Sequence, residues 1–331
     1  MIRDVTTPAY TDAAFIAEVH AWARETCERL GLEISGPIEQ PHIRPWSTVF
    51  RVPTASGAVY LKVCGPSQAH EPRLTKLLQR EFPTLVPEVL ALHPTHDWMV
   101  VAEGGKKLRE VFSPEQMLDE WARILPRYAE LQLALAPHVD EMLGLGAPDQ
   151  RLSRLALDLA AVIDDERVLR FDEPDGLTRD DLPRLRALLP RISAEIETLA
   201  ALGLPDSVQH DDLHDGNVLV GGDRRVIFDW GDANVSHPFL TLTIVLRVAA
   251  FRVSRPESTP EIRRLRDAYL EPFGRLAPPA LLRDAADRGV RLGTLSRALT
   301  WYVVVTRIES ALSAEPYAVS GSLQRVLEAF V

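Results

Sequence analysis

The segment His-Asp-Asp-Leu-His-Asp-Gly-Asn-Val-Leu-Val at residues 210–220 constrains this chain more than any other stretch. A Gly-Gly-Asp turn follows it, and then a second apolar run that ends on Asp229. Apolar runs on both sides of a glycine turn predict a tight β-hairpin. The hairpin gathers Asp212, Asn217 and Asp229 in a small volume. One proton acceptor and two oxygen ligands for Mg²⁺ are what phosphoryl transfer from a nucleotide to a hydroxyl requires, so the pattern predicts an ATP- or GTP-dependent kinase.

These residues also carry a resemblance to a known family. His210, Asp212 and Asn217 form the pattern H-x-D-x-x-x-x-N, and residues 227–230 form the I-x-D-W-like strand end that follows it. The segment resembles the catalytic loop of the aminoglycoside phosphotransferase family, which has the protein-kinase-like fold. The resemblance implies an α+β fold of two lobes, with a small N-terminal antiparallel β-sheet lobe that includes a helix and a larger, mainly helical C-terminal lobe.

Charge and composition restrict the partners of the chain. Lys and Arg number 37 against 47 Asp and Glu, and the net charge of -10 disfavours a nucleic-acid surface and favours cationic or metal-accompanied ligands. Cys27 and Cys64 stand in unrelated segments without metal-ligand spacing. The first residues lack a signal-peptide pattern, and no apolar run reaches the roughly 18 residues of a membrane span. We therefore expect a cytoplasmic protein without nucleic-acid or membrane partners.

Periodicity divides the chain into a mixed part and a helical part. Alternating or helical spacing predicts helices over 11–30 and from Pro72 to before Pro83, and strands over 47–52, 58–63, 87–92 and 98–102. Long helical patterns follow, over residues 117–135, 182–202, 239–251, 260–271, 279–288, 291–312 and 320–330. We place the lobe boundary near residue 104, with a nucleotide-binding lobe at 1–103 and a catalytic and acceptor-binding lobe at 104–331.

The resemblance assigns a role to each residue of the hairpin. Asp212 accepts or orients the proton of the substrate hydroxyl, and Asn217 and Asp229 bind Mg²⁺. His210 supports the loop from behind through hydrogen bonds to its backbone. Each carboxylate and amide also has a plainer interpretation, as a loop cap, a turn residue or a strand-end aspartate. His214 faces either the substrate or the solvent.

In the first lobe, Lys62 on the strand at 60–63 matches the lysine with which the family contacts the α- and β-phosphates. An ammonium group there needs an anionic partner when the phosphates are absent. Glu71, at the start of the next helix, is the first candidate, and Glu81 is the second. The alternative is that Lys62 is a solvated strand charge.

Two further segments are candidate nucleotide contacts. The turn at 45–49 lacks the pattern G-x-G-x-x-G, and its backbone N–H groups with the hydroxyls of Ser47 and Thr48 are candidates to bind a terminal phosphate. The alternative is an ordinary hairpin turn. Ala102 and Glu103 match the position of the hinge between the lobes, where main-chain groups bind a purine base. Nothing in these side chains distinguishes ATP from GTP.

Departures from the family pattern bear on the acceptor. Residues 236–238 read Ser-His-Pro where many relatives have Gly-Asp-Pro, which removes one acidic anchor, although Asp232 keeps the nearer one. Asp211 stands where glycine is common, and we expect it to face outward. Because a polycationic sugar needs a dense set of carboxylates, these changes weigh against an aminoglycoside as the natural acceptor. Trp301, on a helix over 297–311, is a candidate wall of the acceptor pocket or a core residue.

The leading hypothesis is a small-molecule kinase that transfers the γ-phosphoryl group of Mg-ATP or Mg-GTP to a hydroxyl of a sugar, amino alcohol or aminoglycoside-like acceptor. A protein kinase is a weaker alternative, because no Ala-Pro-Glu sequence closes an activation segment after Asp229. A nucleotide-binding scaffold without turnover is the alternative from another class, since fold does not fix function. Asp212, Asn217, Asp229 and Lys62 are all present, which favours an enzyme.

Overall fold

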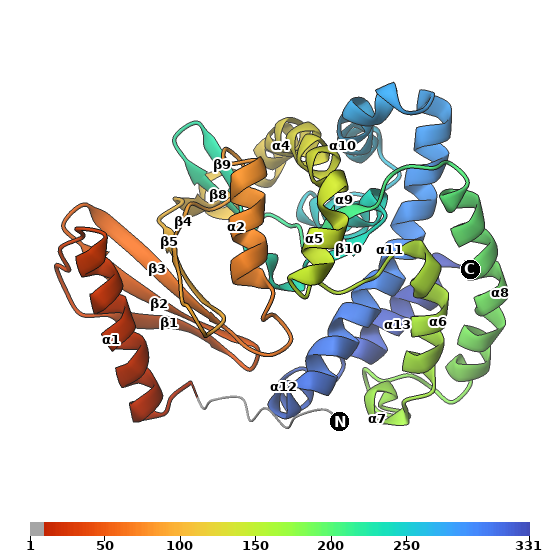
Figure 1. Cartoon of the computed structure of the whole chain (residues 1–331). Helices are drawn as coiled ribbons and strands as arrows, with labels where there is room; N and C mark the ends of the chain where they lie inside the picture. Colours follow the sequence, from red (N-terminus) through yellow and green to blue (C-terminus); the bar gives the residue numbers. More distant parts are fainter. Residues whose placement is uncertain (1–9) are drawn as a thin grey trace.

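The computed structural model describes residues 10–331. Residues 1–9, in which we expected no signal sequence, lie outside this range. A five-stranded antiparallel sheet lies at one side of the molecule and the helices fill the other side (Figure 1). Its strand order is β1 (Glu39–Arg44), β2 (Ser47–Thr54), β3 (Gly57–Cys64), β5 (Trp98–Ala102) and β4 (Val89–Leu92).

Helix α1 (Ala13–Arg29) covers the outer face of this sheet (Figure 1). The carboxylate of Asp12 begins the helix by accepting from the amide of Ala14 at 2.8 Å. Phe15 and other apolar residues of α1 share a buried cluster with Leu61 and Val63 of β3. Because side chains alternate along a strand, Lys62 between them points to the opposite face of the sheet.

Helix α2 (Glu71–Glu81) lies between the sheet and the helical body (Figure 1). Pro72 occupies its first turn, where a missing N–H costs nothing. Leu74, Leu77 and Leu78 are buried in the large core that continues into the helical body. The helix therefore brings its N-terminal Glu71 beneath the inner face of β3.

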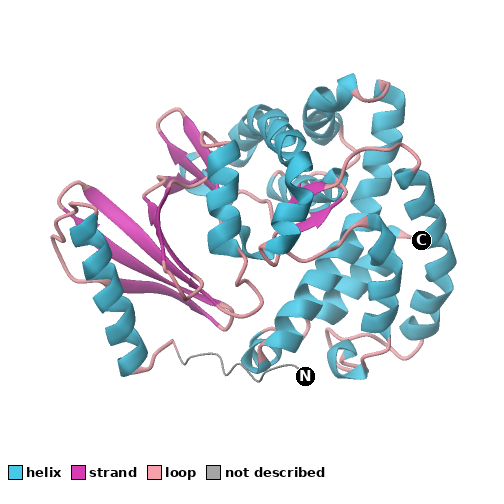
Figure 2. Cartoon of the chain, viewed as in Figure 1, coloured by secondary structure: helices cyan, strands magenta, loops and turns pink. Residues whose placement is uncertain are grey.

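The rest of the described chain is mainly helical, and its named strands form one two-stranded sheet and one three-stranded sheet (Figure 2). The longer helices are α4 (Pro114–Leu135), α6 (Leu152–Ile163), α8 (Asp181–Ala200), α9 (Leu242–Arg252), α10 (Pro260–Leu270), α11 (Pro279–Arg307) and α13 (Ala318–Ala329). The shorter ones are α3 (Leu108–Val111), α5 (Val139–Gly144), α7 (Glu166–Leu169) and α12 (Glu309–Ala314), with single 3₁₀ turns η1 (Ala136–His138), η2 (Trp230–Asp232), η3 (Pro238–Thr241) and η4 (Glu271–Arg275). The strands are β6 (Lys106–Lys107), β7 (Ser207–Gln209), β8 (Val218–Gly221), β9 (Arg224–Ile227) and β10 (Asn234–Ser236).

The α+β class is confirmed, and two details of the prediction are wrong. Helices predicted over 279–288 and 291–312 form the single helix α11, which ends at Arg307. Gly289 does not interrupt it, because the missing side chain lets α11 pack directly against Phe239: an added Cβ would lie 2.7 Å from the Cβ of Phe239. The sequence analysis also gave no individual strand for β1, β6, β7 or β10 and no helix for α3, α5, α6 or α7. The division at residue 104 falls between β5 and β6 and stays our interpretation.

Within residues 10–331, none of the helices combines the length and the low polarity needed to cross a membrane.

Candidate active site

The β8–β9 hairpin fixes the positions of Asn217 and Asp229. The two strands pair from Val218 opposite Ile227 to the turn at residues 221–224. Just beyond the paired region, the amide of Phe228 donates to the carbonyl of Asn217 at 3.0 Å. The two proposed metal ligands thus leave the open end of the hairpin side by side, as the sequence predicted for a hairpin of this length.

Asp229 adopts a strained conformation at this open end. Its φ is 65°, a left-handed value that is uncommon outside glycine and that concentrates at functional sites. Its side chain is 45% exposed, and its Oδ1 lies 2.5 Å from Nζ of Lys62. Burial acts to raise the pKa of Asp229, but the ammonium group of Lys62 outweighs it and holds the pKa below its usual value.

Lys62 joins the sheet to α2 as well as to the hairpin. Its Nζ lies 2.7 Å from the carboxylate of Glu71, so the partner is Glu71 and not Glu81. The thiol of Cys64 donates to the same carboxylate at 3.3 Å. Burial alone would lower the pKa of Lys62, but Asp229 and Glu71 raise it above its usual value. Lys62 is therefore a charged, positioned ammonium group and not a solvated strand charge.

Asp212 lies at the centre of a set of donors. The side-chain amide of Asn217 donates to its backbone carbonyl at 2.9 Å and to its Oδ2 at 3.2 Å. Nε2 of His214 is 3.4 Å from Oδ2, and a guanidinium nitrogen of Arg297 is 3.3 Å from Oδ1. Burial acts to raise the pKa of Asp212, but Arg297 and His214 lower it to about 2, so the group is a carboxylate at neutral pH.

His210 lies behind the loop, as the resemblance implied. Its Nδ1 accepts from the amide of Asp212 at 3.3 Å, which leaves Nε2 to donate to the carbonyl of Phe228 at 2.9 Å. The ring is fully buried and lies 4.7 Å from the ring of Trp230, centre to centre. Burial lowers the pKa of His210, so the imidazole is neutral. Its two hydrogen bonds connect the backbone at Asp212 to the backbone at Phe228, directly before Asp229.

Arg297 of α11 is the site residue that the sequence analysis missed. One of its guanidinium nitrogens lies 2.6 Å from Oδ2 of Asp232, and the other lies 3.3 Å from Oδ1 of Asp212. Its guanidinium carbon lies 5.0 Å from the ring centre of Trp301. The side chain is only 13% exposed. Asp232, predicted as an acidic anchor for the acceptor, is thus paired within the protein, and Gln68 donates to it as well at 3.1 Å.

Asp211 is buried, so the expectation that it faces outward is wrong. The residue is 1% exposed, and its Oδ1 accepts from Gln209 at 2.7 Å and from the hydroxyl of Ser296 at 3.0 Å. A φ of 61° turns it inward. Its burial raises its pKa to about 7, although Arg297 opposes this shift. The partners on α11 are more than eighty residues away, and no local pattern could have indicated them.

Trp301 connects the two parts of the molecule. Its ring packs edge to face against Trp46 of the turn between β1 and β2, with centres 5.6 Å apart. The side chain is only partly buried. Trp301 therefore lies between Trp46 and Arg297 and packs against the edge of the core, and its role as a wall of the acceptor pocket stays a prediction. Neighbouring Tyr302 points elsewhere, since its hydroxyl donates to Asp165 at 3.1 Å.

The remaining candidate nucleotide contacts lie around β2 and β5. Ser47 and Thr48 begin β2 and are both buried. The Thr48 hydroxyl already donates to the carbonyl of His42 at 2.8 Å, so a phosphate contact through it requires that this bond open. The amide of Ala102 donates to the carbonyl of Glu88 at 2.9 Å, and Glu103 is exposed directly after β5.

Asn217 and Asp229 have the donor chemistry that Mg²⁺ prefers. Among residues 10–331, His, Cys, Asp and Glu form no cluster of three or more that resembles an all-protein metal site. Magnesium usually takes only one or two protein carboxylates and completes its shell with water and phosphate oxygens. The amide nitrogen of Asn217 is turned to Asp212, which leaves Oδ1 of Asn217 and the second oxygen of Asp229 for a cation.

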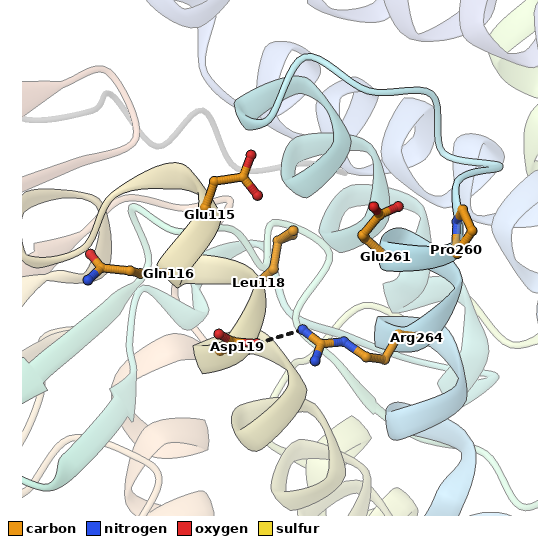
Figure 3. Close-up of a pocket in the computed structure, with 7 residues that line it drawn as sticks. All are labelled: Glu115, Gln116, Leu118, Asp119, Pro260, Glu261 and Arg264. Carbon is orange, nitrogen blue, oxygen red and sulfur yellow. Dashed lines mark hydrogen bonds and ion pairs between the residues drawn. The ribbon is translucent and has the colours of Figure 1, made fainter.

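A groove of about 580 Å³ lies elsewhere, between the beginning of α4 and the beginning of α10 (Figure 3). Its charged side chains pair with one another or with nearby residues. Asp119 lies 2.7 Å from Arg264, and Glu115 lies 2.9 Å from Arg255. None of the predicted site residues lines this groove, so we do not connect it with the chemistry.

Comparison with known sequences decides the family. The profile described as "Phosphotransferase enzyme family" matches residues 41–281, most of the chain and all of the β8–β9 hairpin. The chain belongs to the phosphotransferase enzyme family. It is a phosphotransferase that acts on a hydroxyl acceptor, as the resemblance in the hairpin implied. A comparison with curated proteins gives no match.

Solved structures with the same fold cover nearly the whole chain. An ethanolamine kinase of Plasmodium vivax matches 98% of this chain and 91% of its own, with a TM-score of 0.65 and 13% identity. A choline/ethanolamine kinase family protein of Mesorhizobium loti matches 94% and 99%, with a TM-score of 0.54 and 19% identity. A macrolide 2'-phosphotransferase type I matches 95% and 98%, with a TM-score of 0.54 and 16% identity. The protein-kinase-like fold is thereby confirmed.

Proposed function

We propose that this protein is an ATP- or GTP-dependent small-molecule kinase with Asp212 as the catalytic base. The observation that carries the proposal is the convergence of Lys62, Asp229 and Asp212 between the sheet and the hairpin. Structures of the same fold are named as kinases of ethanolamine and as a phosphotransferase of macrolides, which supports a small hydroxyl-bearing acceptor.

The arrangement suggests how the residues share the work. The acceptor hydroxyl oxygen forms a bond to the γ-phosphorus, the bond from that phosphorus to the β–γ bridging oxygen breaks, and the hydroxyl proton passes to a carboxylate oxygen of Asp212. With its pKa near 2, Asp212 is a weak base. That is sufficient, because phosphoryl transfer depends on positioning and charge stabilisation more than on basicity.

Lys62 lies where it can exchange Asp229 for the oxygens of a triphosphate. Glu71 keeps the ammonium group in place throughout, because its carboxylate is buried in α2. Asn217 and Asp229 would hold Mg²⁺, which neutralises the charge of the phosphates when it binds with the nucleotide. Ser47 of the β1–β2 turn, and the main chain at Ala102 and Glu103, complete the proposed nucleotide site.

The test is acceptor-dependent consumption of nucleotide by the wild type, by Asp212→Ala and by Asp223→Ala. Asp223 is an exposed aspartate in the turn of the same hairpin, so its variant controls for charge and for local folding. We expect Asp212→Ala to lose about 100-fold or more in kcat, in the range typical of a lost general base, and Asp223→Ala to stay near the wild type. Equal turnover by all three proteins would reject Asp212 as the base. Nucleotide binding without turnover by the wild type would favour the scaffold alternative.

A further inference from the structure

Helix α11, which carries Arg297, packs against η3 and α9 in a parallel direction. Gly289 of α11 lies against Phe239, where an added Cβ would come 2.7 Å from the phenyl Cβ. One turn later on both segments, Gly293 lies against Thr243, whose hydroxyl a Cβ would overlap. Both steps are four residues long, so the two segments run side by side in the same direction with no side chain between them at these points.

At the next helical turn along this contact, each segment carries an arginine. Four residues beyond the second contact stand Arg247 on α9 and Arg297 on α11. Arg297 is fully engaged, by Asp232 at 2.6 Å and by Asp212 at 3.3 Å. Arg247 is half-buried, and among residues 10–331 its side chain has neither a hydrogen bond nor an ion pair within 4.0 Å. None of its nitrogens is both buried and unpartnered, so the guanidinium group reaches solvent and is free to bind an anion.

Charges of both signs lie around Arg247. Burial lowers the pKa of Arg247, and the guanidinium groups of Arg325 and Arg297 lower it further. Glu257 and Asp212 act in the opposite direction, which also shows that Arg247 lies within electrostatic range of the proposed base. An arginine stays protonated under these conditions, so Arg247 has a positive charge with which no side chain of residues 10–331 pairs directly.

A cationic acceptor finds little in this site to bind it. The carboxylates of Asp212 and Asp232 are paired with Arg297, and Asp215 lies 2.8 Å from Arg252. The face of Trp301, which would suit an ammonium group, is covered by the same arginine at 5.0 Å. An ammonium compound would have to displace a buried guanidinium group from both carboxylates.

We propose that the acceptor is a small hydroxyl compound that carries an anionic group, a carboxylate or a phosphate, and that Arg247 binds this group while Asp212 faces the hydroxyl. The inference rests on the proposed function and specifies its substrate class. Arg247 is then a specificity-determining residue, since it contacts the acceptor and not the reacting atoms. The fork of a guanidinium group matches both anions through paired hydrogen bonds.

The experiment uses acceptors of one carbon skeleton that differ in charge. The full-length wild type is incubated with Mg-ATP and Mg-GTP and with gluconate, glucose 6-phosphate, glucose or glucosamine, and phosphorylated products are measured by mass. We expect kcat/KM for one or both anionic compounds to exceed that of glucose and glucosamine by about tenfold or more. Comparison of gluconate with glucose 6-phosphate shows whether the site accepts a carboxylate or a phosphate.

Variants at Arg247 test the residue itself. Arg247→Gln should raise KM for the preferred anionic acceptor by about tenfold or more, and Arg247→Lys should raise it less, since the charge remains but the fork is lost. The control is Arg263→Gln, an exposed arginine of α10, which should keep the wild-type KM. Thermal unfolding of each variant verifies that it is folded.

The outcomes separate this inference from the proposed function. If only glucose or glucosamine is phosphorylated, the inference of an anionic acceptor is wrong and the proposed kinase function stands. An unchanged KM in Arg247→Gln has the same meaning. The absence of product with both anionic compounds also counts against the inference. If no acceptor of any charge, including a whole metabolite extract, is phosphorylated by the folded protein, the kinase function itself fails.

Discussion

Nζ of Lys62 lies 2.5 Å from Oδ1 of Asp229, so an ion pair connects the sheet directly to the catalytic hairpin. The same ammonium group is 2.7 Å from the carboxylate of Glu71. Under the proposed function, a triphosphate competes with Asp229 for the lysine and thereby frees an aspartate oxygen for Mg²⁺. Nucleotide and metal are then expected to bind in a coupled manner.

Replacement of Lys62 by Met tests this coupling. We expect kcat/KM for the nucleotide to fall by about 100-fold or more, because the charge that stabilises the phosphates is lost where water is excluded. The control Lys76→Met removes an exposed lysine of α2 and should leave kcat/KM unchanged. The measurement is steady-state kinetics against nucleotide concentration, with circular dichroism to verify folding. A loss of less than threefold contradicts the phosphate-binding role.

Asp229→Asn tests the metal assignment. The side chain is 45% exposed and Lys62 keeps Glu71 as a partner, so the variant should stay folded. An amide is a poorer ligand than a carboxylate for a hard cation, and we expect the Mg²⁺ concentration at half-maximal activity to rise by about tenfold or more. The matched control is Asp223→Asn. An unaltered Mg²⁺ titration in Asp229→Asn would remove Asp229 from the metal site.

The hairpin and the strand of Lys62 followed from local patterns, and the resemblance supplied the role of Lys62. Alternation along β3 assigns the face of Lys62 once Leu61 and Val63 are taken as core, and Pro72 marks the start of the helix that presents Glu71. Each of these inferences depends on residues close in the chain. The family resemblance supplied the rest of the catalytic loop.

Arg297 and Arg247 could not be placed in this way, because only tertiary packing brings α11 and α9 to the loop. The signal was present in Gly289 and Gly293, which lie one turn apart on the face of α11 that carries Arg297. The predicted helices over 279–288 and 291–312 left the first of them between two ranges. Glycine inside a helix indicates either a break or a close approach, and the sequence alone does not separate the two.

Asp211 predicts a dependence of stability on pH. Its pKa is about 7 in the folded protein because of burial and is ordinary, near 4, in the unfolded chain. Between these values the folded state holds a proton that the unfolded state has released, so the contribution of Asp211 to stability falls as pH rises from about 4 to about 7. From pH 5 to pH 7 the decrease is of the order of 2 kcal/mol.

The measurement is urea unfolding of the wild type and of Asp211→Asn at several pH values. Asparagine keeps an oxygen for Gln209 and Ser296 but does not titrate. The stability of Asp211→Asn relative to the wild type should therefore increase as pH rises through this interval. A constant difference between the two proteins contradicts the raised pKa.

Arg297→Gln predicts a change in the pH profile of the reaction. The guanidinium group and His214 hold the pKa of Asp212 near 2 against the effect of burial, so the wild type should show no loss of kcat/KM from Asp212 above about pH 4. Without the positive charge the carboxylate is less stable, its pKa rises, and an acidic limb should appear at higher pH. The rate then falls below the new pKa because the base is protonated.

The control for this variant is Arg291→Gln on the same helix. Arg291 is also partly buried and pairs with the carboxylate of Glu195 at 3.0 Å, but it has no contact with the catalytic loop. Arg297→Gln should lose roughly 3 kcal/mol of stability, as expected when a buried charge pair loses one partner, and adding Asp232→Asn should recover part of the loss. A merely structural role for Arg297 would lower stability without moving the acidic limb of the pH profile. An unchanged pH profile in a folded Arg297→Gln protein would therefore show that Arg297 does not set the ionisation of Asp212.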